Sequence, residues 1–264
     1  MKKPLLCLVS ILVVYFCFLF SGSTFAAEPH EILSAQMVID GKPDADLEEK
    51  AAVFELTQGR IGGGIGPYTA YLCYDAENIY FACNAKDDVV SCKDNVERDF
   101  MNSDYIRFYI CVDDDFKGRQ ALNGKSDWAI IFTPQDTEDN WKPMVKECPY
   151  NGPGHGAIEG DDITPKRASG PGDDGWFIEA ALPFSLFDTT YDELSGRIFG
   201  VYFVAGDTDK SGARTGEMSM QGPGAGNYWN SPDFWQESKL GEFIAVDSAS
   251  KVSITWGWIK GRIP

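Results

Sequence analysis

Segment 207–212 has the residue types of a cation-binding loop. Asp207 and Asp209 place carboxylates at alternate positions, and a glycine follows them. Calcium loops have this spacing, because alternate oxygen ligands and a glycine turn let the chain wrap around one cation. A complete loop has an acid at its twelfth position, where this chain has Met218, with Glu217 one residue earlier. Two interpretations stay open: a structural calcium site with Asp207 and Asp209 as ligands, or a polar hairpin turn.

Segment 104–112 presents a row of side chains that is typical of a ligand-binding surface. Its residues alternate, so the apolar ones share one face of a strand and Tyr105, Arg107 and Tyr109 share the other. Aromatic rings beside an arginine indicate a face that binds a ligand. The alternative is that loops cover this face of the sheet.

Aromatic residues gather again in segment 228–235, beside proline, asparagine and aspartate. An exposed indole such as that of Trp229 can stack on the apolar face of a sugar ring, while polar neighbours bind its hydroxyl groups. The alternative is that these rings close one end of the fold.

Catalytic motifs are not found in the sequence. The chain has two histidines, of which His30 falls in an N-terminal segment expected to be flexible and His155 in a glycine-rich loop, so no nucleophile–histidine triad can be assigned. A glycosidase needs two carboxylates about 5–9.5 Å apart, and a sequence with 40 acidic residues nominates no particular pair. We therefore predict a protein that binds and does not catalyse.

Short β-type segments must position these residues. Helix-period sequence is scarce, with single turns expected at 44–52 and 183–187, and turn residues separate the strand candidates. This pattern predicts an all-β fold, an antiparallel, jelly-roll-like β-sandwich. In the hairpin 68–85 a turn at 75–78 pairs Tyr74 with Ile79 and Cys73 with Tyr80. The expected strands are 36–39, 53–57, 68–74, 79–85, 104–112, 126–133, 176–182, 198–206, 240–246 and 251–258.

The first 26 residues have the pattern of a signal peptide. Lys2 and Lys3 precede an apolar run, and small residues allow cleavage after Ala26. Residues 27–264 then form a single domain, secreted or periplasmic, with no membrane insertion. The formal net charge of −17 argues against nucleic acid and anionic membrane surfaces, and favours a neutral ligand or a cation.

Cysteine usage does not indicate a disulfide scaffold. Two of the seven cysteines fall in the signal segment, which leaves an odd number. The hairpin register puts Cys73 and Cys83 on opposite faces of the sheet, so they cannot bridge. Cys92 and Cys148, in predicted loops, are the candidate pair, and structural zinc is disfavoured.

Several short segments follow one another in a recognisable order. They are VIDGKPD at 38–44, YDAENIYF at 74–81, Asp87, DYIRF at 104–108, GWFIEAALP at 175–183, FGV at 199–201, WNSP at 229–232 and LGEF at 240–243. Taken in this order, they resemble the family 9 carbohydrate-binding modules. The resemblance implies a β-sandwich that holds a sugar between two tryptophans, often with structural calcium, without catalysis and commonly attached to glycoside hydrolases.

The resemblance also implies particular site residues. Trp229 looks like one of the two sugar-binding tryptophans, and Phe100 lies next to the position of the other. Arg107 stands where the family has a glutamate, Val204 where it has a glutamine, and Gly206 where it has an asparagine. The resemblance therefore implies a divergent member that recognises a poly- or oligosaccharide through an altered site.

A second function stays open. Similar sandwiches bind haem, so a redox subunit with methionine, histidine or lysine as axial ligand is the alternative. A surface interaction module that docks through Trp256 and Trp258 is a third.

Overall fold

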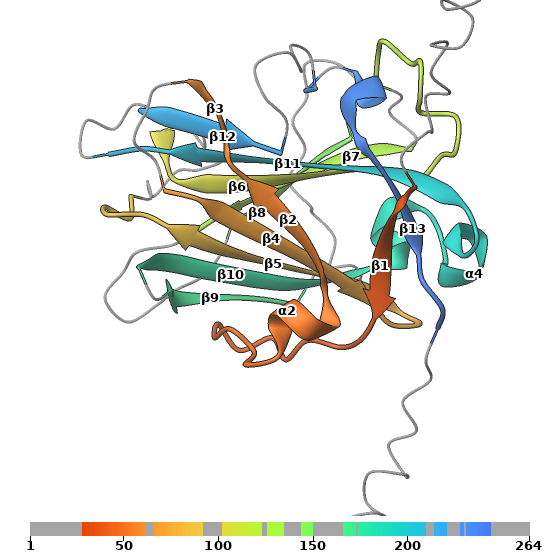
Figure 1. The fold of residues 1–264 in the computed structure, drawn as a ribbon, viewed down its shortest axis with the longest axis horizontal. Coiled ribbons are helices and arrows are strands. Elements are labelled where there is room, and N and C mark those ends of the chain that lie inside the picture. The colour runs from red at the N-terminus through yellow and green to blue at the C-terminus, as the bar shows by residue number, and fades with distance from the viewer. Residues whose placement is uncertain are drawn as a thin grey trace, which may run out of the picture.

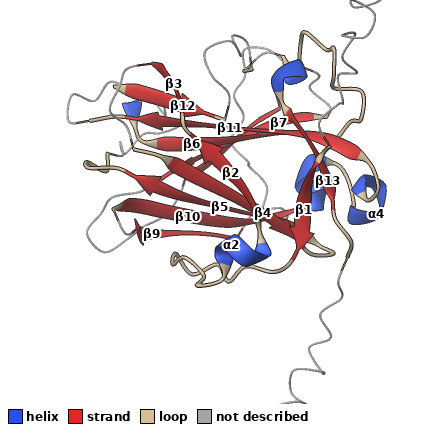
Figure 2. Cartoon of the chain, in the orientation of Figure 1, coloured by secondary structure: helices blue, strands red, loops and turns tan. Residues whose placement is uncertain are grey.

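The computed structural model describes residues 28–61, 66–91, 102–122, 126–134, 144–149, 166–172, 174–209, 214–220, 228–229 and 231–243. Strands dominate these residues (Figure 2). They are β1 (His30–Ser34), β2 (Ala52–Leu56), β3 (Gln58–Ile61), β4 (Tyr68–Tyr74), β5 (Asn78–Lys86), β6 (Tyr105–Cys111), β7 (Asp127–Thr133), β8 (Met144–Pro149), β9 (Lys166–Gly172), β10 (Gly175–Pro183), β11 (Ile198–Asp207), β12 (Gly216–Ser219) and β13 (Gln236–Leu240). The short helices are α2 (Leu47–Lys50), α4 (Tyr191–Leu194) and the 3-10 turns η2 (Phe184–Phe187) and η3 (Pro232–Phe234).

The strands form two layers that β1 joins. The path β8-β7-β6-β11-β13-β1 makes sheet A, to which β12 and β3 are added, and β1-β4-β5-β10-β9 makes sheet B, where β2 pairs with β4. Figure 1 shows the two layers, with β1 and β13 along the right-hand side and α2 below β4 and β5. The expected all-β sandwich is confirmed.

The pairing of β1 differs from the expected all-antiparallel arrangement. This strand runs parallel to β13, with His30 opposite Ser238 and Ile32 opposite Leu240, and then parallel to β4, with Leu33 opposite Cys73. His30 therefore begins a strand and does not lie in a flexible segment. The strand is held because it forms hydrogen bonds with the edge strand of each sheet, β13 in sheet A and β4 in sheet B.

The β4–β5 hairpin has the predicted register. Cys73 pairs with Tyr80 and Tyr74 with Ile79. Asp75 accepts hydrogen bonds from the backbone N–H groups of Glu77 and Asn78, both at 2.8 Å, which is how a short acid closes such a turn.

The main core lies between the sheets and is built around four stacked phenylalanine rings. Phe81 of sheet B lies 4.7 Å from Phe132, 5.9 Å from Phe108 and 5.8 Å from Phe203 of sheet A, measured between ring centroids. Their near-parallel planes bring the two sheets together with rings that fill the space densely.

A second buried cluster covers the outer face of sheet B. It packs Leu47 of α2 against Tyr71, Tyr80 and Phe177. Cys73 belongs to this cluster and Cys83 to the main core, so the two thiols face opposite sides as predicted.

Glu179 attaches the chain before α2 to the same outer face. Its side chain is 1% exposed, and its Oε1 accepts hydrogen bonds from the backbone N–H groups of Asp40 and Gly41, the latter at 2.6 Å. Burial raises the pKa of Glu179 from its ordinary 4.5 to about 7, with the two N–H donors opposing that effect. Gly41 has a φ of +82°, and a Cβ there would lie 2.6 Å from the Ser169 carbonyl oxygen, so this close approach needs glycine.

The predicted segments agree with the structure wherever apolar alternation is strong. The strand at 68–74 coincides with β4, and α2 and η2 fall within the two predicted helical turns. Segment 36–39 is not a strand, and in the predicted strand 240–246 residues 241–243 are not in a strand, because β13 ends at Leu240. The elements β1, β3, β8, β9, β12 and α4 were not predicted. Cys148 lies in β8 and not in a loop. Phe100, Cys92, His155 and segment 251–258 lie outside the described residues.

No helix in the described ranges is both long enough and apolar enough to cross a membrane.

Candidate functional site

Three aspartates meet at one end of the sandwich. Asp87 follows β5, Asp104 precedes β6, and Asp207 ends β11. One carboxylate oxygen from each lies within 4.8 Å of the others. Because β6 and β11 are antiparallel, the start of one strand lies beside the end of the other, and Asp87 joins them from sheet B. The group, here called the aspartate triad, thus connects the two sheets.

The triad is held in place by hydrogen bonds from its surroundings. Asp104 accepts from the backbone N–H groups of Ser91 and of Thr208, the latter at 2.8 Å. The indole N–H of Trp176 donates to Asp87 at 3.1 Å, and the Thr215 hydroxyl donates to Asp207 at 2.6 Å. The carboxylates are therefore fixed in position before any ligand binds.

Burial and mutual repulsion make the negative charges of the triad unfavourable. Desolvation, followed by the charge of Asp87, raises the pKa of Asp104 to about 9, and the pKa values of Asp87 and Asp207 are raised chiefly by burial. A bound dication would relieve this repulsion.

The donor set fits calcium. Asp87, Asp104 and Asp207 would hold such an ion, because Ca²⁺ prefers carboxylate oxygens and one oxygen from each lies within 4.8 Å of the others. The Tyr68 hydroxyl is buried and has no hydrogen-bond partner among the described residues. Desolvation is the largest cause of its raised pKa, and the negative charges of all three aspartates raise the pKa further. An unsatisfied oxygen beside three carboxylates is what a hard cation prefers.

The predicted cation ligands are only partly brought together. Asp207 belongs to the triad, whereas Asp209, half-buried two residues later, does not. Residues 210–213 of the predicted loop lie outside the described residues. The partners of Asp207 flank two other strands, Asp87 after β5 and Asp104 before β6, and do not come from its own loop.

Arg107 lies on the outer face of sheet A between two tyrosine rings. Its guanidinium carbon is 5.6 Å from the ring centroid of Tyr105 and 5.5 Å from that of Tyr109, and Nη1 donates to the Tyr109 hydroxyl at 2.5 Å. The cation–π contacts stabilise the positive charge, and the electron-rich tyrosines keep the pKa of Arg107 raised against the opposing effect of burial.

Glu217 of β12 connects this row to Arg214, just before β12, and to Tyr228. Its Oε2 accepts from the Tyr105 hydroxyl at 3.1 Å and from Nη1 of Arg214, and its Oε1 accepts from the Tyr228 hydroxyl at 3.2 Å. Arg214 Nη1 also donates to the Tyr105 hydroxyl at 3.1 Å. We call Tyr105, Arg107, Tyr109, Arg214, Glu217 and Tyr228 the polar cluster.

Exposure within this region differs from the expected open row. Tyr105 is 0% and Tyr109 1% exposed, because Tyr228 packs edge-on against Tyr109 and Trp235 lies 5.4 Å from it. Loops therefore cover the two tyrosines, which is the alternative that the alternation left open. Arg107 keeps part of its surface, and Trp229, next to the buried Tyr228, is 43% exposed. Trp229 therefore follows directly after a residue that packs on the predicted row, and of these residues it is the one with a large exposed surface.

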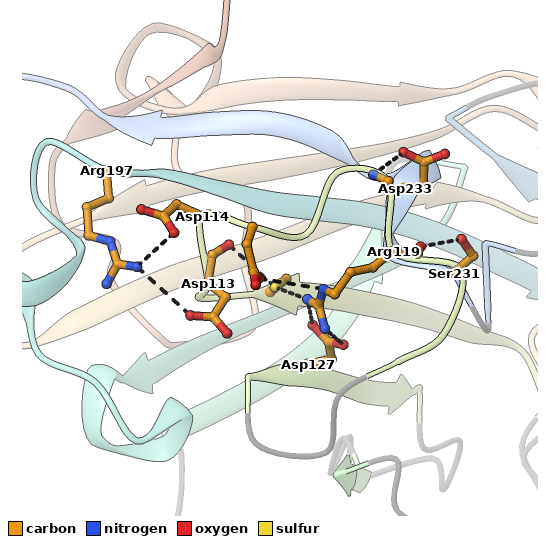
Figure 3. A network of polar contacts seen from close by, with 10 residues as sticks. Asp113, Asp114, Arg119, Asp127, Arg197, Ser231 and Asp233 are labelled. Carbon is orange, nitrogen blue, oxygen red and sulfur yellow. Dashed lines mark hydrogen bonds and ion pairs between the residues drawn. The ribbon is translucent and has the colours of Figure 1, made fainter.

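The segment that carries Trp229 is fixed by a polar network (Figure 3). Arg119 forms two hydrogen bonds with the buried Asp127 carboxylate, at 2.8 and 2.9 Å. The Ser231 hydroxyl donates to the Arg119 carbonyl oxygen at 2.8 Å, and the Gly118 N–H donates to Asp233 at 2.6 Å. A bidentate arginine–carboxylate pair is geometrically rigid, so it fixes the loop that holds the chain after Trp229, at Ser231 and Asp233.

Gly206 makes room for Tyr105. A Cβ on Gly206 would lie 2.1 Å from Cε1 of that ring, which lies across β11 where a side chain would otherwise project. Gly206 and the buried Tyr105 opposite it are therefore parts of one arrangement.

Replacing Gly206 with alanine is expected to displace Tyr105 and destabilise the fold by roughly 1–3 kcal/mol, the usual cost of overpacking. Chemical denaturation would measure the change. Gly59, in β3, is the matched control, because a Cβ there meets nothing within 4 Å and Gly59→Ala is expected to change stability by no more than about 0.5 kcal/mol. Equal effects of the two substitutions would contradict the proposed packing.

Comparison with known proteins identifies the fold. No protein-family model matches the chain, and no curated protein sequence matches it. Two solved structures of a family 9 carbohydrate-binding module from Caldicellulosiruptor kristjanssonii are similar. The complex with cellotriose has a TM-score of 0.59 at 17% identity, covering 83% of this chain and 95% of that one. The complex with glucose has a TM-score of 0.57 at 18% identity, covering 83% and 98%.

The protein is thus a β-sandwich with the fold of the family 9 carbohydrate-binding modules, a divergent example of that architecture. At this level of identity the likeness is one of fold.

Sequence reasoning missed four residues of the two sites. Asp87 and Asp104 occur in the segments that carry the family resemblance, but nothing local marks them as cation ligands. Arg214 and Glu217 lie three residues apart and form an ion pair. Their opposite charges at this spacing are visible in the sequence. A predicted strand at β12 could have identified these two residues as a candidate pair. The strand has only four residues of mixed polarity, so its sequence gives little indication of a strand.

Proposed function

We propose that this protein is a non-catalytic carbohydrate-binding protein that recognises a poly- or oligosaccharide on the outer face of sheet A. The observation that carries the proposal is the exposed Trp229 beside the polar cluster, on a sandwich whose fold is shared with carbohydrate-binding modules. An indole supplies a flat apolar surface for a sugar ring, and guanidinium groups supply donors for its hydroxyl oxygens.

The proposal includes a structural calcium ion at the aspartate triad. The ion would bind Asp87, Asp104 and Asp207 and connect the sheets next to the binding face, since Tyr105 follows Asp104 and Gly206 precedes Asp207 in the chain. Its contribution is to position residues and not to take part in chemistry.

Export is also part of the proposal. It is supported by the two lysines and the apolar run that open the sequence, followed by small residues up to Ala26. An exported protein of this type encounters extracellular or periplasmic glycans. Through association with a glycoside hydrolase, its binding would bring the enzyme to its substrate.

Replacing Trp229 with alanine is expected to weaken saccharide binding by at least about 1 kcal/mol, roughly fivefold, because the stacking surface is lost. Affinity electrophoresis on a panel of polysaccharides, followed by calorimetry on the best ligand, would measure it. Phe243→Ala is the matched control, since Phe243 is 38% exposed but packs near Tyr74 and Tyr191, away from the polar cluster.

Folded wild-type protein that is retarded by no polysaccharide would overturn the proposed function. Equal losses in the Trp229 and Phe243 variants would place the binding site elsewhere on the molecule.

A further inference from the structure

Tyr68 is a fully buried tyrosine whose hydroxyl has no hydrogen-bond partner among the described residues. A buried hydroxyl without a partner costs free energy, and most such groups in folded proteins are therefore paired. Tyr74, on the same strand, shows the usual arrangement: it is also 0% exposed, and its hydroxyl donates to the Gly241 carbonyl oxygen at 2.8 Å. The unpaired hydroxyl of Tyr68 therefore calls for an explanation.

The register of sheet B places Tyr68 beside the aspartate triad. Tyr68 of β4 and Trp176 of β10 both stand opposite Ala85 of β5, one on each side of it (Figure 1). The small Ala85 side chain lets the two rings meet edge to face, with their centroids 5.9 Å apart. Asp87 lies two residues after Ala85, and the Trp176 indole N–H donates to it at 3.1 Å. The two rings thus lie together next to Asp87.

The Tyr68 hydroxyl lies close to all three carboxylates of the triad. After desolvation, the causes of its raised pKa are the charges of Asp87, Asp207 and Asp104, in that order. The hydroxyl therefore stays protonated and neutral at physiological pH. Although carboxylates are strong acceptors, it donates to none of the three. A neutral oxygen near three carboxylates, bonded to none of them, has the position of a ligand around a shared cation.

A neutral oxygen is also the ligand that the charge balance of the triad favours. Calcium takes about six to eight oxygen ligands, from carboxylates and from neutral groups. Three carboxylates already carry one more negative charge than the ion carries positive, so a further acid would add repulsion. A hydroxyl oxygen adds a ligand without adding a charge.

We propose that the Tyr68 hydroxyl oxygen is a further protein ligand of the cation at the aspartate triad. The inference rests on the calcium ion of the proposed function and deepens it. In the metal-free protein the hydroxyl lowers stability, because it is buried without a partner. In the calcium-loaded protein the same oxygen would hold the ion. Tyr68 thus lowers the stability of the metal-free protein and raises its affinity for the cation.

Calorimetric titration of the full protein with calcium at pH 8, after removal of metal with a chelator, tests the proposal. Tyr68→Phe removes only the hydroxyl group and should weaken calcium binding by about tenfold or more, as the loss of a group that supports a metal site does. Without calcium, the same variant should unfold at the wild-type temperature or up to about 5 °C above it, because the unsatisfied hydroxyl is gone.

Tyr74→Phe is the matched control, because it removes a buried hydroxyl that has a partner on the same strand's other end. It should lower the unfolding midpoint of the metal-free protein by about 2–6 °C, since the Gly241 carbonyl oxygen loses its donor. Its calcium affinity should stay within about twofold of the wild-type value, as expected for a distant site.

Each other outcome is decisive. Unchanged calcium affinity in Tyr68→Phe, or an equal loss in Tyr74→Phe, overturns the role of Tyr68 and leaves the calcium site intact. A metal-free Tyr68→Phe protein that unfolds below the wild type shows that the hydroxyl is satisfied, which also overturns that role. Absence of calcium binding by the wild-type protein overturns the proposed calcium site itself.

If Tyr68→Phe does not fold, a crystal structure of the calcium-loaded wild-type protein decides the question. The Tyr68 hydroxyl oxygen should then lie about 2.3–2.6 Å from the ion, the distance of a direct calcium ligand. A longer distance overturns the role of Tyr68, whether or not the three aspartates hold the ion.

Discussion

Calcium added to metal-depleted protein at pH 8 is expected to raise the midpoint of thermal unfolding by on the order of 5–10 °C. A ligand at 100 times its dissociation constant stabilises the folded state by about 2.7 kcal/mol, and a protein of this size gains roughly 2–4 °C for each kcal/mol. The physical source is the aspartate triad, where three carboxylates within 4.8 Å of one another repel in the absence of a cation. Scanning calorimetry with and without a chelator would measure the shift.

The pH dependence of this effect has a definite sign. The pKa of Asp104 is about 9 in the folded protein and 3.8 as its ordinary value, so the folded state holds the proton more tightly. A raised acid pKa contributes stability that is complete below 3.8 and is lost as the pH rises toward 9. Metal-depleted protein should therefore lose stability across this window. Calcium should remove much of the loss, and its stabilising effect should be small near pH 4.

Two substitutions distinguish calcium binding at the triad from calcium binding to other acidic residues. Asp104→Asn removes a buried charge and an anionic ligand, so it should abolish the calcium-induced shift. Asp209→Asn, two residues after Asp207 but outside the triad, should leave the shift unchanged. A calcium effect that survives in Asp104→Asn, or one that disappears in Asp209→Asn alone, would show that the ion binds elsewhere.

Replacing Glu179 with alanine is expected to lower the free energy of unfolding by roughly 2–5 kcal/mol. The substitution leaves the N–H groups of Asp40 and Gly41 without their acceptor, and each buried donor left unsatisfied costs about 1–3 kcal/mol. The chain leading into α2 would then lose its attachment to sheet B. Urea denaturation monitored by tryptophan fluorescence would measure the loss.

Two control variants test the role of Glu179: one removes only its charge, and the other removes a glutamate at an exposed position. Glu179→Gln keeps one acceptor oxygen and should lose less stability than the alanine variant. It should also remove the decrease in stability that the wild-type carboxyl contributes as pH rises from 4.5 to about 7, measured with calcium saturating so that the triad does not contribute. Glu242→Ala, at an exposed position, should be nearly neutral. A Glu179→Ala protein as stable as Glu242→Ala would contradict the anchoring role.

The sandwich could be predicted from sequence wherever the strands carry their own signal. In β6 the residues Ile106, Phe108 and Ile110 enter the main core, as strict alternation predicted. In contrast, β9 has the sequence KRASGPG, whose glycines and proline indicate a loop. It is a strand because it pairs along β10, with Ile178 opposite Ser169, which is a tertiary effect that local propensity does not contain.

The aspartate triad, which is the proposed cation site, contains one of the two predicted ligands for a related reason. Asp207 and Asp209 are neighbours in sequence, so their alternation was visible, but successive loop residues need not point to one place. Asp87 and Asp104 reach Asp207 only because β5, β6 and β11 end or begin at the same end of the sandwich. The identity of such a triad depends on the order of strands in two sheets, which the sequence alone did not determine.

The proposed binding face, on the outer side of sheet A, shows what alternation in a sequence cannot predict. The pattern correctly assigned Tyr105, Arg107 and Tyr109 to the face opposite the core, but it contains no information about what lies above that face. Tyr228 and Trp235, distant in sequence, cover the tyrosines and leave Trp229 at the surface. Exposure is decided by these long-range contacts, so the residues that a ligand can reach could be identified only from the structure.

The seam between the sheets has a consequence for how the chain matures. Because β1 pairs with β13, the first described strand completes its hydrogen bonds only after the last one has been synthesised. Until then both sheets keep an open edge, and such edges promote association between unfinished chains. Closing so long a loop is slow, so the docking of β1 between the two sheets is expected to be a late step in folding.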